Sequence, residues 1–389
     1  MIFKGESMKY DLLRFILAAT LLLTTSPAIT DQPAWAAHLE ERGIQVSAGV
    51  WDLPTGKLIE SYQPDLALIP ASTTKVVSSY AILRTLKPDF RLTTTVLGDL
   101  QNGVVKGDLV IRGGGDPFLT NEYIWMLAQE LKSRNVSSVT GSLRFDQRAF
   151  DSQIYGSGWE NTTRNTTPPI LPLSVNFNRD DKGLITRNPG QLAKEVITRI
   201  FTESGITFEG GPDADGKKSV IVAYKSPTLR ILIDSVNKYS NNFITEMLVK
   251  HFGDGSWAKG VSRIQEFYKT HLDLEPGEIH ITDGSGLSKS NRLSAKTLST
   301  ILRAAWHDFE VGPEFVSSLK YIGGEPYSLQ IKDPNLTRRV RCKTGHLNDV
   351  DSICGFIHMP DGKTRVFALI LNGPCTREDV EYVLKLWAN

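Results

Sequence analysis

The stretch Pro70-Ala-Ser-Thr-Thr-Lys75 begins a segment, residues 70–86, that predicts a helix. Proline is tolerated in a first helical turn because its missing N–H would have no partner there. Ser72 and Lys75 stand three residues apart and therefore share one helix face. A lysine amine one turn away can take a serine proton once burial lowers the amine's pKa. The pair predicts a serine nucleophile with its base; for an isolated S-x-x-K, the alternative is a capping serine and a surface lysine.

A second short motif, Ser240-Asn241-Asn242, follows a segment at 228–238 that also predicts a helix. Such a turn exposes a hydroxyl and an amide side by side. The hydroxyl can relay a proton to a leaving amine, and the amide can hold either a substrate peptide group or the amine of Lys75. The alternative for this motif alone is a polar turn that faces solvent.

A third motif, Lys343-Thr344-Gly345, precedes His346 and a predicted strand at 352–358. Glycine lets a ligand approach the backbone of an edge strand closely. Lys343 and Thr344 offer a charge and a hydroxyl to a carboxylate. The backbone N–H groups of His346 and Ser72 together can form an oxyanion hole.

The two ends of the chain carry the pattern of one antiparallel sheet. Alternating apolar residues predict strands at 44–50 and 57–62 with a turn between them, and a second strand pair at 352–358 and 365–372. A final apolar stripe, Val380, Val383, Leu384 and Trp387, predicts a helix that covers a sheet face. We therefore expect an α/β (α+β) fold in which helices flank an antiparallel sheet.

The middle of the chain has a different sequence pattern, with glycine-rich turns, short β runs and a helix-like segment near 125–131. This pattern predicts an inserted β-rich domain at 97–224. The catalytic domain is then discontinuous and comprises residues 37–96 and 225–389.

The N-terminus predicts a secretory signal peptide over residues 1–36. Lys9 and Arg14 precede a short apolar run, and small-x-small sites follow at 26–28 and 34–36. The run is too short to span a bilayer, and the alternative is a buried N-terminal helix. We expect export to the periplasm, no transmembrane segment after signal removal, and no amphipathic tail after the last predicted helix.

Composition excludes several other classes. The chain has 389 residues, 40% of them hydrophobic, and a formal net charge of +1, so no basic field predicts nucleic-acid binding. Cys342, Cys354 and Cys375 allow one disulfide, whose pairing stays open. Without a C-x-x-C pair or clustered histidines, the sequence predicts no metal site and no cofactor. It does not predict the oligomeric state.

Together the three motifs resemble those of the D-alanyl-D-alanine carboxypeptidase/endopeptidase family of class C low-molecular-mass penicillin-binding proteins. Gly113-Gly-Gly-Asp-Pro117 and Asp283-Gly-Ser-Gly-Leu-Ser288 extend the resemblance, which runs from about Gly49 to the C-terminus. The family carries a large insertion between its first two motifs, and the interval between Ser72 and Ser240 leaves room for one. The resemblance implies a β-lactamase/transpeptidase-like fold.

The resemblance also implies roles. The catalytic residues that it implies are Ser72, Lys75, Ser240, Asn242 and Lys343, and the implied substrate-binding residues are Thr344, Gly345, His346 and Asp146. Asp146 resembles an insertion-domain acid that meets the amino end of a diamino-acid side chain; the alternative is a structural aspartate beside a turn. The implied substrates are peptidoglycan peptides, with β-lactam antibiotics as covalent inhibitors.

Three departures from the family pattern stand out. Asn241 replaces an aspartate at a position whose side chain is expected to support the fold, and His346 replaces a small residue, which narrows the site or makes it sensitive to pH. The insertion is shorter than in the larger relatives. Two other functions stay open at this point: a serine β-lactamase or esterase of the same fold, and a non-catalytic peptidoglycan-binding module.

Overall fold

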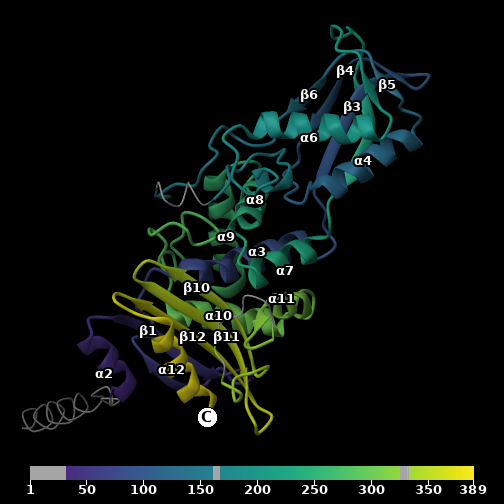
Figure 1. Cartoon of the computed structure of the whole chain (residues 1–389). Helices are drawn as coiled ribbons and strands as arrows, with labels where there is room; N and C mark the ends of the chain where they lie inside the picture. The colour runs from purple at the N-terminus through teal and green to yellow at the C-terminus, as the bar shows by residue number, and fades with distance from the viewer. Residues whose placement is uncertain (1–31, 161–166, 325–330, 332) are drawn as a thin grey trace, which may run out of the picture.

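The computed structural model describes residues 32–160, 167–324, 331 and 333–389. Two bodies are visible in Figure 1, one around strands β1 and β10 to β12 and the other around strands β3 to β6. Helices α3 and α7 to α9 lie beside the first sheet, toward the second body (Figure 1). Residues 1–31 of the predicted signal peptide, which spans 1–36, lie outside the described residues.

The first sheet is antiparallel, and its strand order within the described residues is β2-β1-β12-β11-β10-β9. Strand β1 pairs with β12 from Gln45 opposite Asn372 to Asp52 opposite Arg365. The prediction that the N-terminal hairpin and the C-terminal strands share one sheet is therefore confirmed. The strand bounds are β1 (Gln45–Asp52), β2 (Leu58–Tyr62), β9 (Lys320–Tyr321), β10 (Val340–Leu347), β11 (Val350–His358) and β12 (Thr364–Asn372).

Helices α2 (Ala34–Glu41) and α12 (Arg377–Ala388) share a hydrophobic core with one face of this sheet. The predicted apolar stripe of the last helix is confirmed, since all four of its residues are buried. Trp387 packs edge-on against Trp35, with ring centroids 5.9 Å apart. Trp35 and Ala36 are only 4% and 0% exposed. A signal peptide that ended at residue 36 would remove both from the core, so the predicted boundary at 36 disagrees with the packing.

The other face of the sheet carries a helical layer that encloses the largest core. Helix α3 is buried on nearly all sides as far as Leu83, which fits a central helix. Tyr268 donates a hydrogen bond to the Val77 carbonyl of α3, at 2.6 Å, and so ties α9 to α3. The bounds are α3 (Thr74–Leu86), α7 (Leu229–Lys238), α8 (Asn242–Phe252), α9 (Trp257–Leu272), α10 (Ala295–His307) and α11 (Gly312–Ser318).

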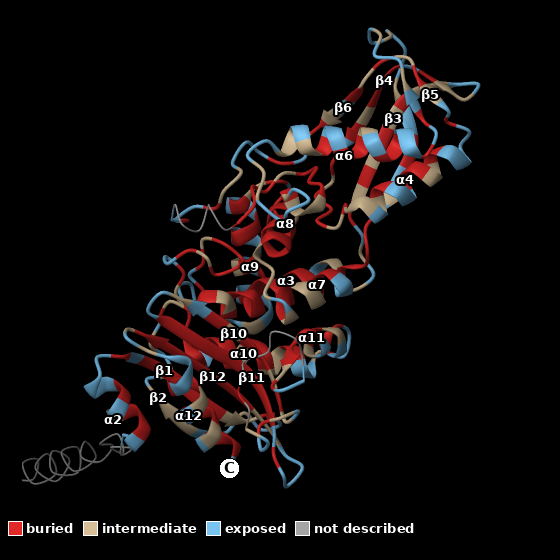
Figure 2. Cartoon of the chain, viewed as in Figure 1, coloured by how far each residue is buried: buried red, intermediate tan, exposed pale blue. Residues whose placement is uncertain are grey.

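The second body has a mixed sheet, in which β3 pairs antiparallel with β4 and β8, while β5 and β6 run parallel to β4. Two helices share a core with this sheet and turn their outer sides to solvent (Figure 2). The bounds are β3 (Thr93–Gln101), β4 (Val104–Arg112), α4 (Asn121–Ser133), β5 (Ser138–Val139), β6 (Leu143–Asp146), η2 (Asn176–Asn178), α6 (Pro189–Glu203), β7 (Thr207–Phe208) and β8 (Ser219–Lys225).

The predicted insertion contains a sheet, as expected, and helix α6, whose apolar stripe the prediction of short β runs overlooked. Strand β3 begins at Thr93, before the predicted boundary at 97. We propose that the inserted domain spans 93–225, the first and last residues of its paired strands β3 and β8.

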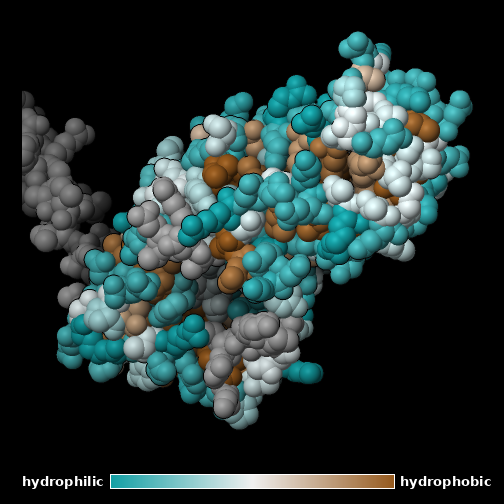
Figure 3. Space-filling view, turned by 45° about the horizontal axis from the view of Figure 1, so that its top comes forward, coloured by the Kyte–Doolittle hydropathy of each residue, from teal (hydrophilic) through white to brown (hydrophobic). Residues whose placement is uncertain are grey.

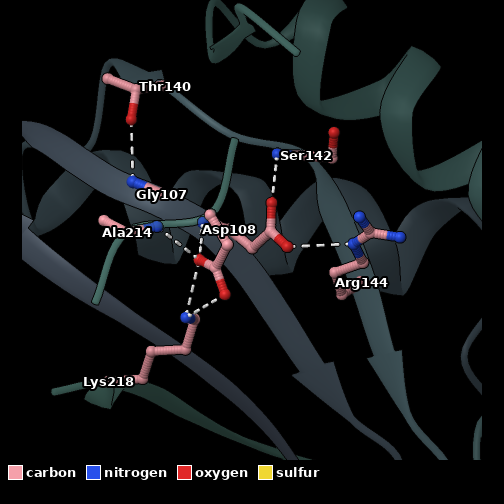
Figure 4. A network of polar contacts seen from close by, with 8 residues as sticks. Gly107, Asp108, Thr140, Ser142, Arg144, Ala214 and Lys218 are labelled. Carbon is pink, nitrogen blue, oxygen red and sulfur yellow. Dashed lines mark hydrogen bonds and ion pairs between the residues drawn. The ribbon is translucent and has the colours of Figure 1, made fainter. Parts of the chain in front are cut away.

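Carboxylates hold the turns of the second sheet in place (Figure 4). Asp108 of β4 accepts hydrogen bonds from the Ser142 N–H at 2.7 Å and from the Arg144 guanidinium at 3.0 Å. Asp213 accepts from the Asp108 N–H and from the Lys218 amine, both at 2.8 Å. These contacts fasten β6 and the segment before β8 to β4.

The three cysteines are free thiols, so the disulfide that the sequence allows does not form. Cys342 and Cys354 belong to different hydrophobic cores on opposite faces of the first sheet. Burial raises the pKa of Cys342 to about 11.

The face of the molecule in Figure 3 is hydrophilic over much of its area and shows hydrophobic residues in separate patches. No helix in the described part of the chain is long and apolar enough to cross a membrane.

Candidate active site

Ser72 lies in the short 3-10 turn η1 (Ala71–Thr73) directly before α3. The turn is strained, since the non-glycine residue Ala71 has a φ of 49°. The Pro70 carbonyl is held by the hydroxyls of Ser352, at 2.6 Å, and Thr73, at 2.7 Å. The Ser352 bond ties this turn to β11, and the Thr73 bond closes the turn itself.

The Lys75 amine lies 3.0 Å from the Ser72 hydroxyl oxygen. It also contacts the side-chain oxygen of Asn242 and the carbonyl of Ser285, both at 2.7 Å. Burial lowers the pKa of Lys75 to about 7, against the attraction of the Glu246 and Asp283 carboxylates. A neutral amine donates two hydrogens to these oxygens and turns its lone pair to the Ser72 hydroxyl. The expected contact between Ser72 and Lys75 is present, and their roles as nucleophile and base stay predictions.

The second motif joins α7 to α8. Ser240 has a φ of 54° in the turn, and its hydroxyl oxygen accepts a hydrogen bond from Lys343 at 2.9 Å. Asn242 is the first residue of α8, and of the two partners that the sequence left open for its amide, the structure gives it Lys75. The side chain of Asn241 caps α8 by accepting from the Ile244 N–H at 3.0 Å. The expectation that Asn241 supports the fold agrees with this cap.

The third motif lies on β10. Lys343 is buried, and its amine also donates to the Thr344 carbonyl at 2.7 Å. Burial, and then repulsion by Lys75 and Lys320, lowers the pKa of Lys343. Gly345 passes so close to η1 that a Cβ atom would lie 2.8 Å from the Ser72 nitrogen. Only glycine allows this contact between strand and nucleophile.

Residues of all three motifs, Ser72 among them, line a cavity of about 260 Å³. His346 lines it, and the His346 ring contacts the Asp351 carboxylate at 2.9 Å. The residues that line this cavity are Ser72, Lys238, Tyr239, Ser240, Lys320, Thr344, Gly345, His346, Asp351, Ser352, Arg377 and Val380. Lys75 and Lys343 do not line the cavity themselves. Their amines contact the hydroxyls of Ser72 and Ser240, which do.

Asp146 lies apart both from this cavity and from the side chains that contact Ser72 and Lys75. It ends β6 of the second sheet and lines another pocket, with Arg112 and Arg148. Arg148 donates to both of its carboxylate oxygens, at 2.9 and 2.8 Å, and Arg112 donates at 2.8 Å. The hydrogen bonds from Arg148 have the largest effect on the pKa of Asp146, which they lower. Contact between Asp146 and a substrate amine stays a prediction.

Two buried carboxylates that raise the pKa of Lys75 were not among the predicted site residues. Asp283 accepts hydrogen bonds from Trp159, Gly286, Ser288 and Asn291 and so shapes the 283–288 loop. Glu246 accepts from the backbone of the same loop. The sequence could have indicated that Glu246 lies near the site, because Glu246 comes one helical turn after Asn242 and therefore shares its helix face. Within the described residues, no group of three histidines, cysteines or acids could hold a metal ion.

Two relatives match most of this chain. The chain is 24% identical over 407 residues to the D-alanyl-D-alanine carboxypeptidase DacB of Haemophilus influenzae, covering 82% of this chain and 84% of the relative. It is 24% identical over 459 residues to a D-alanyl-D-alanine carboxypeptidase of an Actinomadura species, covering 90% and 84%.

Solved structures share the fold. Penicillin binding protein 4 of Haemophilus influenzae superposes with a TM-score of 0.77 at 20% identity, covering 89% of this chain and 94% of that one. The predatory peptidoglycan endopeptidase Bd3459 of Bdellovibrio bacteriovorus gives a TM-score of 0.59 at 16% identity, covering 89% and 93%. These likenesses confirm the predicted fold class.

One family model accounts for almost the whole described chain. The model of the D-Ala-D-Ala carboxypeptidase 3 (S13) family matches residues 34–186 and 173–385, and these two ranges contain all three motifs. The resemblance drawn from the motifs is thereby confirmed. The chain is a serine hydrolase and belongs to the D-Ala-D-Ala carboxypeptidase 3 (S13) family.

Proposed function

We propose that the protein is an exported serine D-alanyl-D-alanine carboxypeptidase/endopeptidase that cleaves peptidoglycan stem peptides through an acyl-enzyme on Ser72. The observation that carries the proposal is the buried amine of Lys75, 3.0 Å from the Ser72 hydroxyl oxygen, which lines the same cavity as Ser240 and Thr344. A base of lowered pKa beside a serine is the arrangement that activates a hydroxyl at neutral pH.

In the first step, Ser72 attacks the carbonyl of the penultimate D-alanine. Its O–H bond breaks as the proton passes to neutral Lys75, and a new bond forms between the hydroxyl oxygen and the carbonyl carbon. The carbonyl electron pair moves onto oxygen, where the N–H groups of Ser72 and His346 stabilise it. The C–N bond then breaks. Ser240 delivers its hydroxyl proton to the leaving amine and takes up the proton that Lys75 carries, so Lys75 is neutral again.

In the second step, water attacks the acyl-enzyme and gives up its proton to Lys75, and Ser72 leaves with its hydroxyl restored. Lys343 and Thr344 hold the substrate carboxylate. Thr344 lines the cavity, and the amine of Lys343 contacts the hydroxyl of Ser240, which also lines it. A β-lactam follows the first step only, because its ring opens without a departing group and the acyl-enzyme persists.

The same residues serve a carboxypeptidase, which releases a terminal D-alanine, and an endopeptidase, which opens a D-alanyl cross-link. The two reactions differ only in the size of the leaving amine. We propose export because the residues before α2 carry the charged start and short apolar run of a signal peptide. Cleavage after Ala28 rather than after Ala36 leaves Trp35 in the core.

The test is intact-protein mass measurement after treatment with benzylpenicillin. We expect the mass to rise by one penicillin in the unaltered protein and in Ser133→Ala, an exposed serine on α4, and to stay unchanged in Ser72→Ala. Preincubation with diacetyl-lysyl-D-alanyl-D-alanine should slow the labelling. Equal labelling of Ser72→Ala would overturn the proposal, and rapid loss of the adduct with turnover of the drug would favour a β-lactamase.

A further inference from the structure

Glu246 is a carboxylate with no exposed surface, in the middle of α8. Its oxygens accept hydrogen bonds from the Ser285 N–H at 2.7 Å, the Gly284 N–H at 3.2 and 3.3 Å, and the Trp257 indole at 2.8 Å. An ionised group in such a place is costly unless its environment compensates for the lost water. The three N–H groups supply that compensation, so the site is built for a carboxylate.

The same loop residue that Glu246 holds also contacts the catalytic amine. Ser285 donates its N–H to Glu246, while its carbonyl oxygen accepts from Lys75 at 2.7 Å. Asn242, one turn before Glu246 on α8, accepts from Lys75 at 2.7 Å as well. Helix α8 therefore reaches Lys75 twice, directly through Asn242 and through the Ser285 peptide from Glu246.

Few other charges face this carboxylate. Lys75 approaches from α3, and Asp283 approaches from the loop before α10. Lys250 lies one turn further along α8, with its amine 4.4 Å from the centroid of the Trp257 ring. Burial, and then repulsion by Asp283, raises the pKa of Glu246. Of the two carboxylates whose attraction raises the pKa of Lys75, Glu246 has the larger effect.

We propose that Glu246 is a positioning residue. Its carboxylate fixes the Ser285 peptide against the Lys75 amine, and its charge balances the ammonium that forms when Lys75 takes the proton of Ser72. This step places a cation on a fully buried side chain, where a nearby negative charge has a large effect. The inference rests on the proposed function, because it concerns the base of that reaction.

The experiment measures the rate of acylation by a fluorescent penicillin between pH 5 and 9. In Glu246→Gln, we expect the rate at high pH to fall by about 10- to 100-fold. The acylation rate rises with pH as Lys75 loses its proton, and this rising part of the pH–rate profile is its limb. We also expect the limb to move to lower pH by about 1 unit in this variant, because a charge that raises the pKa of Lys75 is gone. In Glu246→Asp the charge remains, so the limb should stay in place while the rate falls.

Tyr268→Phe is the matched control. It removes another buried hydrogen bond to α3, from the Tyr268 hydroxyl to the Val77 carbonyl, on a residue that faces neither Lys75 nor the cavity. It should lower the unfolding temperature and leave the limb where it is. An equal displacement of the limb in Tyr268→Phe would overturn the inference, because loss of stability alone would then explain the shift.

Each outcome separates the inference from the proposed function. If the unaltered protein takes no label on Ser72, the proposed function fails. If it is labelled and Glu246→Gln matches it in both limb and rate, only the inference fails. Should Glu246→Gln not fold, Glu246→Asp is measured in its place. A slower rate with an unmoved limb then supports the positioning role, and a wild-type rate refutes it.

Discussion

The lowered pKa of Lys75 predicts the pH dependence of acylation. Only the neutral amine can take the proton of Ser72, so the rate follows the neutral fraction of Lys75. Burial lowers this pKa from 10.5 to about 7. At pH 7 about half of the amines are then neutral, against roughly 1 in 3000 for an ordinary lysine. The fold therefore raises the population of active base about a thousandfold.

The assay is the second-order rate of acylation by a fluorescent penicillin, measured from pH 5 to 10. The rate should rise about tenfold per pH unit below about pH 6 and reach a plateau above about pH 8. The direction follows from the sign of the shift: a base of lowered pKa loses its proton, and so becomes active, at lower pH.

Imidazoles ordinarily titrate in the same range, so His346→Gln is the control for the residue that lines the cavity. It should keep the rising limb. A rate that continues to climb tenfold per unit up to pH 10 would refute the reasoning, because Lys75 would then behave as an exposed lysine. A flat profile between pH 5 and 9 would refute it equally.

Two further predictions concern the fold. Asp108→Ala leaves the Ser142 N–H and the Arg144 guanidinium without their shared acceptor, so we expect unfolding in urea to show a loss of about 1–3 kcal/mol with penicillin labelling retained; unchanged stability would contradict the network in Figure 4. The mature N-terminus of exported protein should lie before Trp35, and N-terminal sequencing that begins after Ala36 would show that the core does not need the Trp35 side chain.

Local sequence patterns predicted most of the elements that carry the site. Alternation and turn residues predicted both hairpins of the first sheet, and the apolar stripe predicted α12, because these signals depend only on neighbouring residues. The insertion was harder to interpret. Strands β5 and β7 have two residues each, too few for any periodicity, and they pair with partners distant in the chain.

The sequence by itself determined the chemistry that the protein can attempt: a serine and a lysine on one helical turn, an amide after a turn, and a lysine on a strand beside a glycine. It did not determine which side chains meet. Lys75 contacts residues 167 and 210 positions away, and the carboxylate of Glu246 acts on it through a third segment. The resemblance also placed Asp146 among the substrate-binding residues, yet Asp146 pairs with two arginines outside the cavity.

The physical reason is that burial and long-range contact set the charge state of a group, and neither is written in local spacing. An exposed lysine three residues after a serine is an ordinary cation. The same lysine under α8 and the 283–288 loop loses its water and becomes a base at neutral pH. Only the tertiary structure distinguishes these two cases.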